Sequence, residues 1–249
     1  MKKPKRLWIG TSGWSYDSWK TGFYAGVPRR RWLQHCAQNF DGVEVNMTFY
    51  RMPRLSVLEK WRDETPPDFR FAVKAWRGIT HLKRLRDVGE SVRQQREGLV
   101  SLMEKISVVL WQLPAGLHCD LDLLEGFAAC LADWPEVPHA IEFRHTSWFE
   151  ETVRQRLEDA GLANVISHAA KWPMWDIVSS DLVYLRFHGA PRTYASGYSD
   201  EELDAWAARM RQWLGETRTV HAYFDNDVEG RAPYDALTLR AKVLDRTGD

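Results

Sequence analysis

Eight short apolar runs recur along this chain, and each ends in polar or glycine residues before the next segment begins. Strands that alternate with helices in this way are typical of βα units and a parallel sheet. The runs cover residues 7–10, 43–45, 69–73, 108–111, 140–143, 164–167, 182–185 and 220–224. The length of 249 residues suits one closed barrel of eight units. We therefore predict an α/β fold, a single (β/α)₈ TIM barrel over residues 1–249, with residues 1–6 as a flexible basic tail.

The segments between the runs carry helical signals, with one exception. Ser199 and Glu202 have the spacing of a capping box, and a helical period joins Leu33, Cys36, Ala37 and Phe40. Residues 171–180 are rich in Trp and Pro and lack this period, which predicts one irregular unit after the sixth strand. An open doubly wound sheet is the alternative. The closed barrel is favoured because no GxGxxG turn follows the first run.

The charge balance and the cysteines limit the classes of partner. Lys plus Arg number 34 and Asp plus Glu number 34, so no net positive charge attracts a nucleic acid or an anionic membrane. No segment has the length of a membrane span. The three cysteines, Cys36, Cys119 and Cys130, lack CxxC spacing, which argues against disulfides and a structural zinc site. We expect a cytoplasmic protein without a membrane partner.

The polar residues at the ends of the runs belong to longer motifs. These include GTSGWSY at residues 10–16, VEVNMTFY at 43–50, FAVK at 71–74, EFRH at 142–145, RFHG at 186–189 and YFDND at 223–227. In these motifs the chain resembles the YecE-like family, from about residue 8 to residue 240. The resemblance implies a TIM barrel and a family without an established substrate or reaction. The family often has Asp after its sixth strand, where this chain has His168.

A barrel of this kind forms its active site at the C-terminal ends of its strands. Side chains two residues apart on a strand share a face, so several polar pairs should meet at this mouth of the barrel. The predicted catalytic residues are Glu44, Lys74, Glu142 and His188. The predicted substrate-binding residues are Trp14, Asn46, Gln112, Arg144, Arg186 and Asn226.

These residue types favour acid–base chemistry on a phosphorylated or sugar-like small molecule, as in a hydrolase or an isomerase. One glutamate would act as general acid and the other as base or nucleophile, while Arg144, Arg186 and Lys74 would hold an anionic group. An equally weighted alternative makes Glu44 and Glu142 parts of a buried ion network. A less favoured role for Lys74 is that of a Schiff-base nucleophile.

Three further interpretations stay open. No cofactor is favoured, but a divalent metal is an alternative, with Glu44, Glu142, His168, His188 and Asp225 as its ligands. A nucleic-acid-associated barrel of the repair type would use the basic N-terminus and Arg29–Arg31, although the zero net charge counts against it. A non-catalytic ligand-binding scaffold is the third, because the fold alone does not exclude it.

Overall fold

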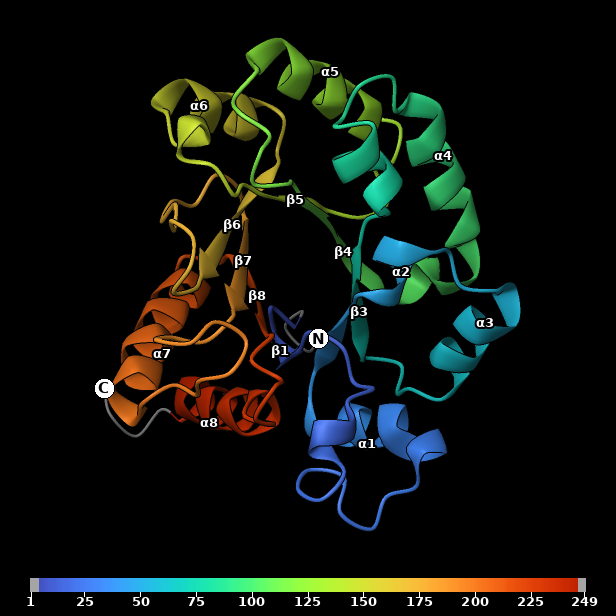
Figure 1. Ribbon diagram of the computed structural model, residues 1–249, viewed down its shortest axis with the longest axis vertical. Helices are drawn as coiled ribbons and strands as arrows, with labels where there is room; N and C mark the ends of the chain where they lie inside the picture. The colour runs from blue at the N-terminus through green and yellow to red at the C-terminus, as the bar shows by residue number, and fades with distance from the viewer. Residues whose placement is uncertain (1–4, 246–249) are drawn as a thin grey trace.

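Eight parallel strands form the centre of the molecule, which we describe from a computed structural model that covers residues 5–245 (Figure 1). Every predicted run coincides with one of these strands, so the predicted TIM barrel is confirmed. The strands are β1 (Leu7–Thr11), β2 (Gly42–Val45), β3 (Arg70–Lys74), β4 (Ile106–Gln112), β5 (His139–Glu142), β6 (Ala163–His168), β7 (Leu182–Phe187) and β8 (Thr219–Phe224).

The barrel is nearly closed, with a narrow seam between β1 and β2. The strands follow the order β1-β8-β7-β6-β5-β4-β3-β2. Across the seam, the amide of Gly13 donates to the carbonyl of Glu44 at 2.7 Å, and Ser12 and Glu44 form an isolated bridge. A Cβ atom on Gly10 would lie 1.9 Å from the carbonyl oxygen of Gly42. Only glycine therefore permits this close approach of β1 to β2.

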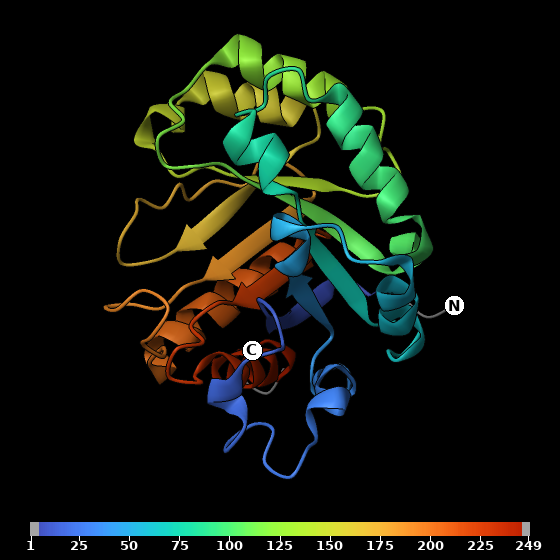
Figure 2. The ribbon, with the colours of Figure 1, turned by 45° about the vertical axis from the view of Figure 1, so that its right-hand side comes forward.

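The helices surround the strands (Figures 1 and 2). Their apolar faces cover the barrel, and the predicted capping box at Ser199 and Glu202 is present. They are α1 (Trp32–Asn39), α2 (Met47–Tyr50), α3 (Leu55–Asp63), α4 (Gly89–Gly98), α5 (Leu121–Leu131), α6 (Glu151–Asp159), α7 (Asp200–Gly215) and α8 (Ala232–Leu244).

The predicted irregular unit lies between β6 and β7, where residues 169–181 form no helix. The side-chain amide of Asn164 instead holds this segment, because it donates to the carbonyl oxygens of Trp175 and Ile177 at 3.0 and 3.2 Å. The ladder between β5 and β6 is also short, with only Ala140 and Ile141 of β5 in register. The ladder between β5 and β6 thus ends at Ile141 and Asn164, before the C-terminal ends of the two strands.

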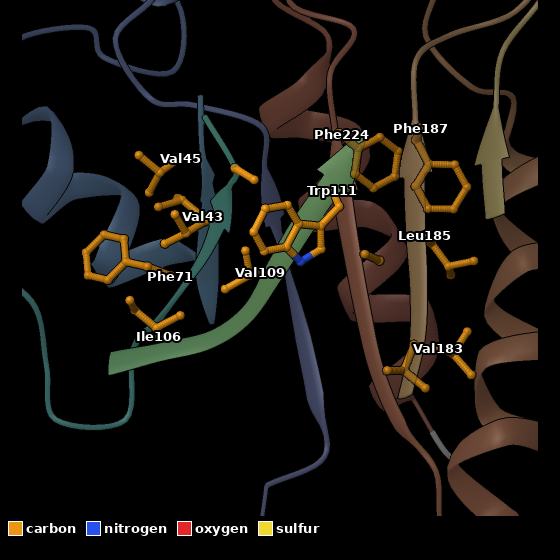
Figure 3. Close-up of a cluster of buried hydrophobic side chains, with 14 of the residues drawn as sticks. Val43, Val45, Phe71, Ile106, Val109, Trp111, Val183, Leu185, Phe187 and Phe224 are labelled. Carbon is orange, nitrogen blue, oxygen red and sulfur yellow. The ribbon is translucent and has the colours of Figure 1, made fainter. Parts of the chain in front are cut away.

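Side chains alternate along each strand between two packing layers. The outward layer, between strands and helices, contains most of the large apolar groups, including Trp111 and the stacked rings of Phe187 and Phe224, 4.6 Å apart (Figure 3). The inward layer is formed by smaller groups such as Ala72 and Ala140, together with two tyrosines. At the C-terminal ends of the strands this inward layer becomes charged, and the candidate functional site begins there.

The first described residues are bonded to the barrel. Lys5 Nζ lies 2.8 Å from Asp41 Oδ1, and the carbonyl of Arg6 accepts from the amide of Val220 at 2.7 Å. The predicted tail therefore does not extend to Lys5 and Arg6, and its residues 1–4 lie outside the described part of the chain. Among residues 5–245, no helix has the length and apolar character needed to cross a membrane.

Candidate functional site

The guanidinium of Arg186 lies inside the barrel mouth and joins two buried glutamates. Its Nη2 and Nε atoms donate to Glu44 Oε1 and Oε2 at 2.7 and 3.0 Å, and its Nη1 donates to Glu142 Oε2 at 2.8 Å. All three side chains are at most 1% exposed. Charge-assisted bonds of this kind offset the cost of removing the groups from water. The structure thus brings three of the predicted site residues into direct contact.

Glu44 has its hydrogen-bonding capacity filled by protein groups. Besides the two bonds from Arg186, it accepts a short hydrogen bond from the Ser12 hydroxyl and another from the Tyr184 hydroxyl at 2.7 Å. Two carboxylate oxygens accept about four bonds in all. The contacts of Glu44 support the ion-network interpretation, and its role in proton transfer stays a prediction.

Glu142 keeps one oxygen directed away from Arg186. Its Oε1 atom lies 2.5 Å from Arg144 Nη2 and 3.9 Å from His188 Nε2, and it forms no well-aligned hydrogen bond among the described residues. Burial would raise the pKa of Glu142, but the guanidiniums of Arg144 and Arg186 outweigh burial and hold this pKa well below its usual range. Glu142 is therefore ionised at neutral pH, where it can accept a proton but has none to donate.

His188 is a neutral imidazole between Arg186 and Asp225. Its Nε2 lies 3.3 Å from Arg186 Nη1, which can only donate, so we assign the ring proton to Nδ1. Nδ1 lies 3.0 Å from Asp225 Oδ2, at the end of β8. Burial, and then the charge of Arg186, lower the pKa of His188. The pair Asp225–His188 has the arrangement of a base oriented by a carboxylate.

Lys74 differs from the other cations of the mouth. Its ammonium lies 4.5 Å from the centre of the Phe49 ring and forms no ion pair with a carboxylate of residues 5–245. Burial, and then the nearby charge of Arg186, lower the pKa of Lys74 to about 8. At the end of β3 the structure thus places an amine whose two protonation states are both populated near neutral pH.

Two aromatic side chains border the mouth on the side of β6 and β7. The Arg144 guanidinium lies 3.7 Å from the centre of the Trp172 ring, and the ring centroid of His188 is 4.9 Å from that of Trp172 and 5.5 Å from that of Tyr194. The indole of Trp172 donates to the Ser167 hydroxyl at 3.0 Å, which fixes its orientation. Trp172 and Tyr194 therefore pack over His188.

Comparison with known proteins agrees with this fold. A family model described as "Protein of unknown function DUF72" matches residues 8–248. The chain belongs to the DUF72 family. The resemblance to the YecE-like family is thereby confirmed, since the UPF0759 protein YecE of Escherichia coli (strain K12) is 26% identical over 259 residues, 94% of this chain and 91% of the relative. The UPF0759 protein YunF of Bacillus subtilis (strain 168) is 25% identical, over 91% of this chain and 90% of its own.

Solved structures of DUF72 proteins have the same architecture. One from Thermotoga maritima MSB8 superposes with a TM-score of 0.84 at 27% identity, covering 96% of this chain and 99% of its own. Another, from Enterococcus faecalis V583, has a TM-score of 0.82 at 21% identity, covers 95% of this chain and 94% of its own, and is evidence for the fold alone. These relatives establish the family and the barrel, while the chemistry has to be argued from the site of this DUF72 chain.

Two further predicted residues lie at the mouth. Asn46 donates through Nδ2 to the Ser12 hydroxyl at 2.8 Å, and its Oδ1 is buried without a partner among the described residues. Gln112 is in register with Glu142 on the neighbouring strand and donates to the carbonyl of Leu113 at 2.9 Å. Both amides therefore extend the polar surface around the buried ion network.

Two predicted substrate-binding residues, Trp14 and Asn226, are placed elsewhere by this DUF72 fold. Trp14 packs edge-on against Trp61 of α3, with ring centroids 5.1 Å apart. Asn226 donates to Asp235 of α8 at 2.7 Å and to the carbonyl of Ser196 at 3.0 Å, so it ties two loops together. These contacts point to packing and anchoring rather than substrate binding.

His168, a predicted metal ligand, faces the helices. Its Nδ1 lies 3.1 Å from the Tyr198 hydroxyl, and its ring packs against Trp206 of α7. Ser167, in register with Arg186, is the inward residue at this end of β6. Among residues 5–245, no three His, Cys, Asp or Glu side chains are positioned to hold a metal ion together.

Asp227 is a site residue that the sequence did not single out. Burial, and then the charge of Asp225, raise the pKa of Asp227 well above its usual range, while His188 and Arg186 outweigh burial and lower the pKa of Asp225. Two carboxyl groups whose pKa values are shifted in opposite directions thus lie together at the end of β8. The spacing of two residues in this motif was the available signal, but only the fold shows that the two environments differ.

Proposed function

We propose that the barrel mouth is the active site of an enzyme that acts by acid–base chemistry on a small anionic molecule, either phosphorylated or sugar-like. The observation that carries this proposal is the amino group of Lys74, half-buried at a strand end without a carboxylate partner among residues 5–245. An ammonium group partly removed from water is costly to leave without an anionic partner. An anionic substrate would supply the missing partner.

Lys74 is also the group best suited to move a proton. With a pKa of about 8, its neutral amine can accept a proton from the substrate and its ammonium can return one. Glu142 is ionised and His188 is neutral, so neither competes as the acid at neutral pH. Proton transfer of this kind suits an isomerisation or a hydrolysis, the two reaction classes that the residue types favour.

Two polar atoms of the mouth that lack a partner among the described residues indicate the kind of substrate. Arg144 Nε is a buried donor without a partner among the described residues, on a guanidinium already oriented by Trp172, and it suits a phosphate or carboxylate oxygen. Asn46 Oδ1 is a buried acceptor without a donor among the described residues, and it suits a hydroxyl group. Leaving such atoms unsatisfied costs about 1–3 kcal/mol each. A molecule with an anionic group and a hydroxyl group would satisfy both atoms.

Competitive labelling with trace acetic anhydride from pH 6 to 11, read by mass spectrometry, tests the amine. Lys74 should label with a midpoint of about 8, with the exposed Lys20 as a reference for reagent access. Ribose 5-phosphate, glucose 6-phosphate and gluconate, added in turn, should include a ligand that protects Lys74. A midpoint near the ordinary lysine value of about 10.4 would remove the basis of the proposal.

Variants then separate binding from chemistry. For any compound that is turned over, Lys74→Arg should retain binding, because the charge is kept, but lose turnover by roughly 10²–10⁴-fold. Glu142→Gln should also remove turnover while the barrel stays folded, which tests the predicted role of this glutamate. A protecting compound that is bound but never converted would instead favour the ligand-binding scaffold.

A further inference from the structure

Two chain segments extend from the barrel mouth over the C-terminal face of the barrel. Residues 46–54 begin directly after β2, residues 74–86 begin with the last residue of β3, and these strands are neighbours in the sheet. The Thr48 hydroxyl donates to the carbonyl of Lys74 at 2.7 Å, and the rings of Phe49 and His81 pack edge-on at 5.0 Å. In Figure 1, α2 lies beside β3. The two segments thus form one continuous surface.

This surface carries uncompensated positive charge. The two segments contain no Asp or Glu, and their cationic residues are Arg51, Arg54, Lys74, Arg77, Lys83, Arg84 and Arg86. Arg86 pairs with Asp120 at 3.5 Å, whereas the other six form no ion pair with a carboxylate of residues 5–245. Elsewhere on the surface, arginines such as Arg154 and Arg209 have acidic partners. This sector therefore carries net positive charge in a protein whose net charge is zero, although Lys83 and Arg84 already donate hydrogen bonds to neighbouring oxygens.

Exposed aromatic side chains lie among these cations. Tyr50 is 66% exposed and Trp76 is 37% exposed, and each directly precedes an unpaired arginine in the chain, Arg51 and Arg77. Exposed large apolar groups are costly unless they have a use, and they often mark interaction sites. Aromatic rings interleaved with cations are the combination that binds unpaired bases and their phosphates.

His81 lies within the second segment. Its ring packs against Phe49, and its Nδ1 lies 2.8 Å from the Thr80 hydroxyl. Burial lowers the pKa of His81 to about 4, with further lowering by the positive charges of Lys74, Arg77 and Arg144. This direction agrees with the excess of cations in the two segments.

We propose that Tyr50, Arg51, Arg54, Trp76, Arg77 and Lys83, here called the basic–aromatic strip, form a binding surface for single-stranded nucleic acid. The arginines and Lys83 would contact phosphates, and Tyr50 and Trp76 would stack on bases. Duplex DNA fits less well, because its bases are stacked internally and offer no free face to these rings. An acidic peptide could pair with the cations but would leave the exposed rings unused. The strip lies outside the mouth, so this inference goes beyond the proposed acid–base function.

Fluorescence anisotropy with the full chain tests the strip. The probes are a labelled mixed-sequence 20-nucleotide DNA strand, the same sequence as a duplex, and a labelled poly-glutamate peptide, each measured between 25 and 200 mM salt. The single strand should bind most tightly and weaken steeply with salt. Arg51→Ser with Arg54→Ser should reduce the salt slope by about 1.4, because each phosphate contact on a single strand contributes about 0.7.

Matched variants make the assignment specific. Arg30→Ser with Arg31→Ser removes the same charge from the other exposed basic turn and should change single-strand binding less than twofold. Trp76→Ala should weaken the single strand about tenfold and leave the peptide unaffected. No single-strand binding at 25 mM salt, equal losses in the two double variants, or a preference for the peptide would each overturn the proposal. Thermal melting of every variant confirms that these exposed substitutions leave the barrel folded.

Discussion

Lys74 and Lys105 lie at opposite ends of the barrel, and the contacts of their ammonium groups differ. Lys105 precedes β4 at the N-terminal end, and its Nζ lies 2.6–3.0 Å from four oxygens, the carbonyls of Arg62, Thr65 and Pro66 and the Thr65 hydroxyl. Lys74 ends β3 at the opposite end, where its ammonium lies 4.5 Å from the centre of the Phe49 ring and forms no ion pair with a carboxylate of residues 5–245. The protein supplies oxygen partners to the ammonium of Lys105, whereas no such oxygen contacts the ammonium of Lys74 among the described residues.

The contrast extends to the surroundings of the two ends. Inside the N-terminal end, neutral rings such as those of Trp8 and His221 stack at 4.8 Å, and burial lowers the pKa of His221 to about 3. A cavity of about 600 Å³ opens there, but its arginines, Arg154 and Arg218, already have acidic partners. The size of a cavity therefore does not show which end of the barrel is the better candidate for a functional site. Several buried polar atoms that have no hydrogen-bond partner among the described residues lie at the C-terminal mouth.

The largest change in the free energy of unfolding is expected for a substitution of Lys105. Lys105→Met should lower the free energy of unfolding by about 2–4 kcal/mol, because buried carbonyls on the turn after α3 lose their donor. Urea unfolding at pH 7 measures this difference. A loss below about 1 kcal/mol would mean that the oxygens around Lys105 contribute little, and the contrast between the two lysines would fail.

The matched substitution at the mouth should act in the opposite direction. The folded-state pKa of Lys74, about 8, lies below the unfolded value, so charging this amine opposes folding at every pH below 8. Lys74→Met should therefore raise the free energy of unfolding at pH 7 by about 1–3 kcal/mol. As the pH rises from 8 toward 10.5 the penalty of the parent disappears, and so should the advantage of the variant. A destabilised variant at pH 7 would show that Lys74 has a structural partner after all.

The smallest effect concerns the carboxyl pair at the end of β8. The raised pKa of Asp227 means that the folded state keeps its proton after the unfolded chain has lost it, so the parent loses stability as the pH rises above about 4. Asp227→Asn mimics the protonated form and should stabilise the protein by roughly 1 kcal/mol at pH 7, with no gain at pH 4. Chemical denaturation at both values measures this.

Asp225→Asn provides the control of opposite sign. Asp225 lies 3.3 Å from Arg186 Nη2 and 3.0 Å from His188 Nδ1, and its pKa is lowered. Its substitution should therefore destabilise the protein at pH 7, and the loss should shrink as the pH falls through the pKa of the folded state. If both variants changed the stability at pH 7 in the same direction, Asp225 and Asp227 would share one environment.

The sequence by itself determined the barrel and the inward face of its strands. Apolar runs of the right length and spacing located all eight strands, and the period of two placed Glu44, Glu142 and Arg186 on the inner surface. The same period, applied to β6, would have directed Ser167 inward and His168 outward. These properties depend on neighbours along the chain, which a sequence displays directly.

Only the tertiary structure decided which of these groups are already paired. Arg186 reaches Glu44 across 142 positions of sequence and Glu142 across 44, and the positions of Trp14 and Asn226 depend on loops, where no period applies. The physical reason is that the charge state of a buried group, and whether it has a hydrogen-bond or ion-pair partner, depend on distances through space. Those distances exist only once the strands have closed into a barrel, and they leave Lys74 as the amine without a carboxylate at its mouth.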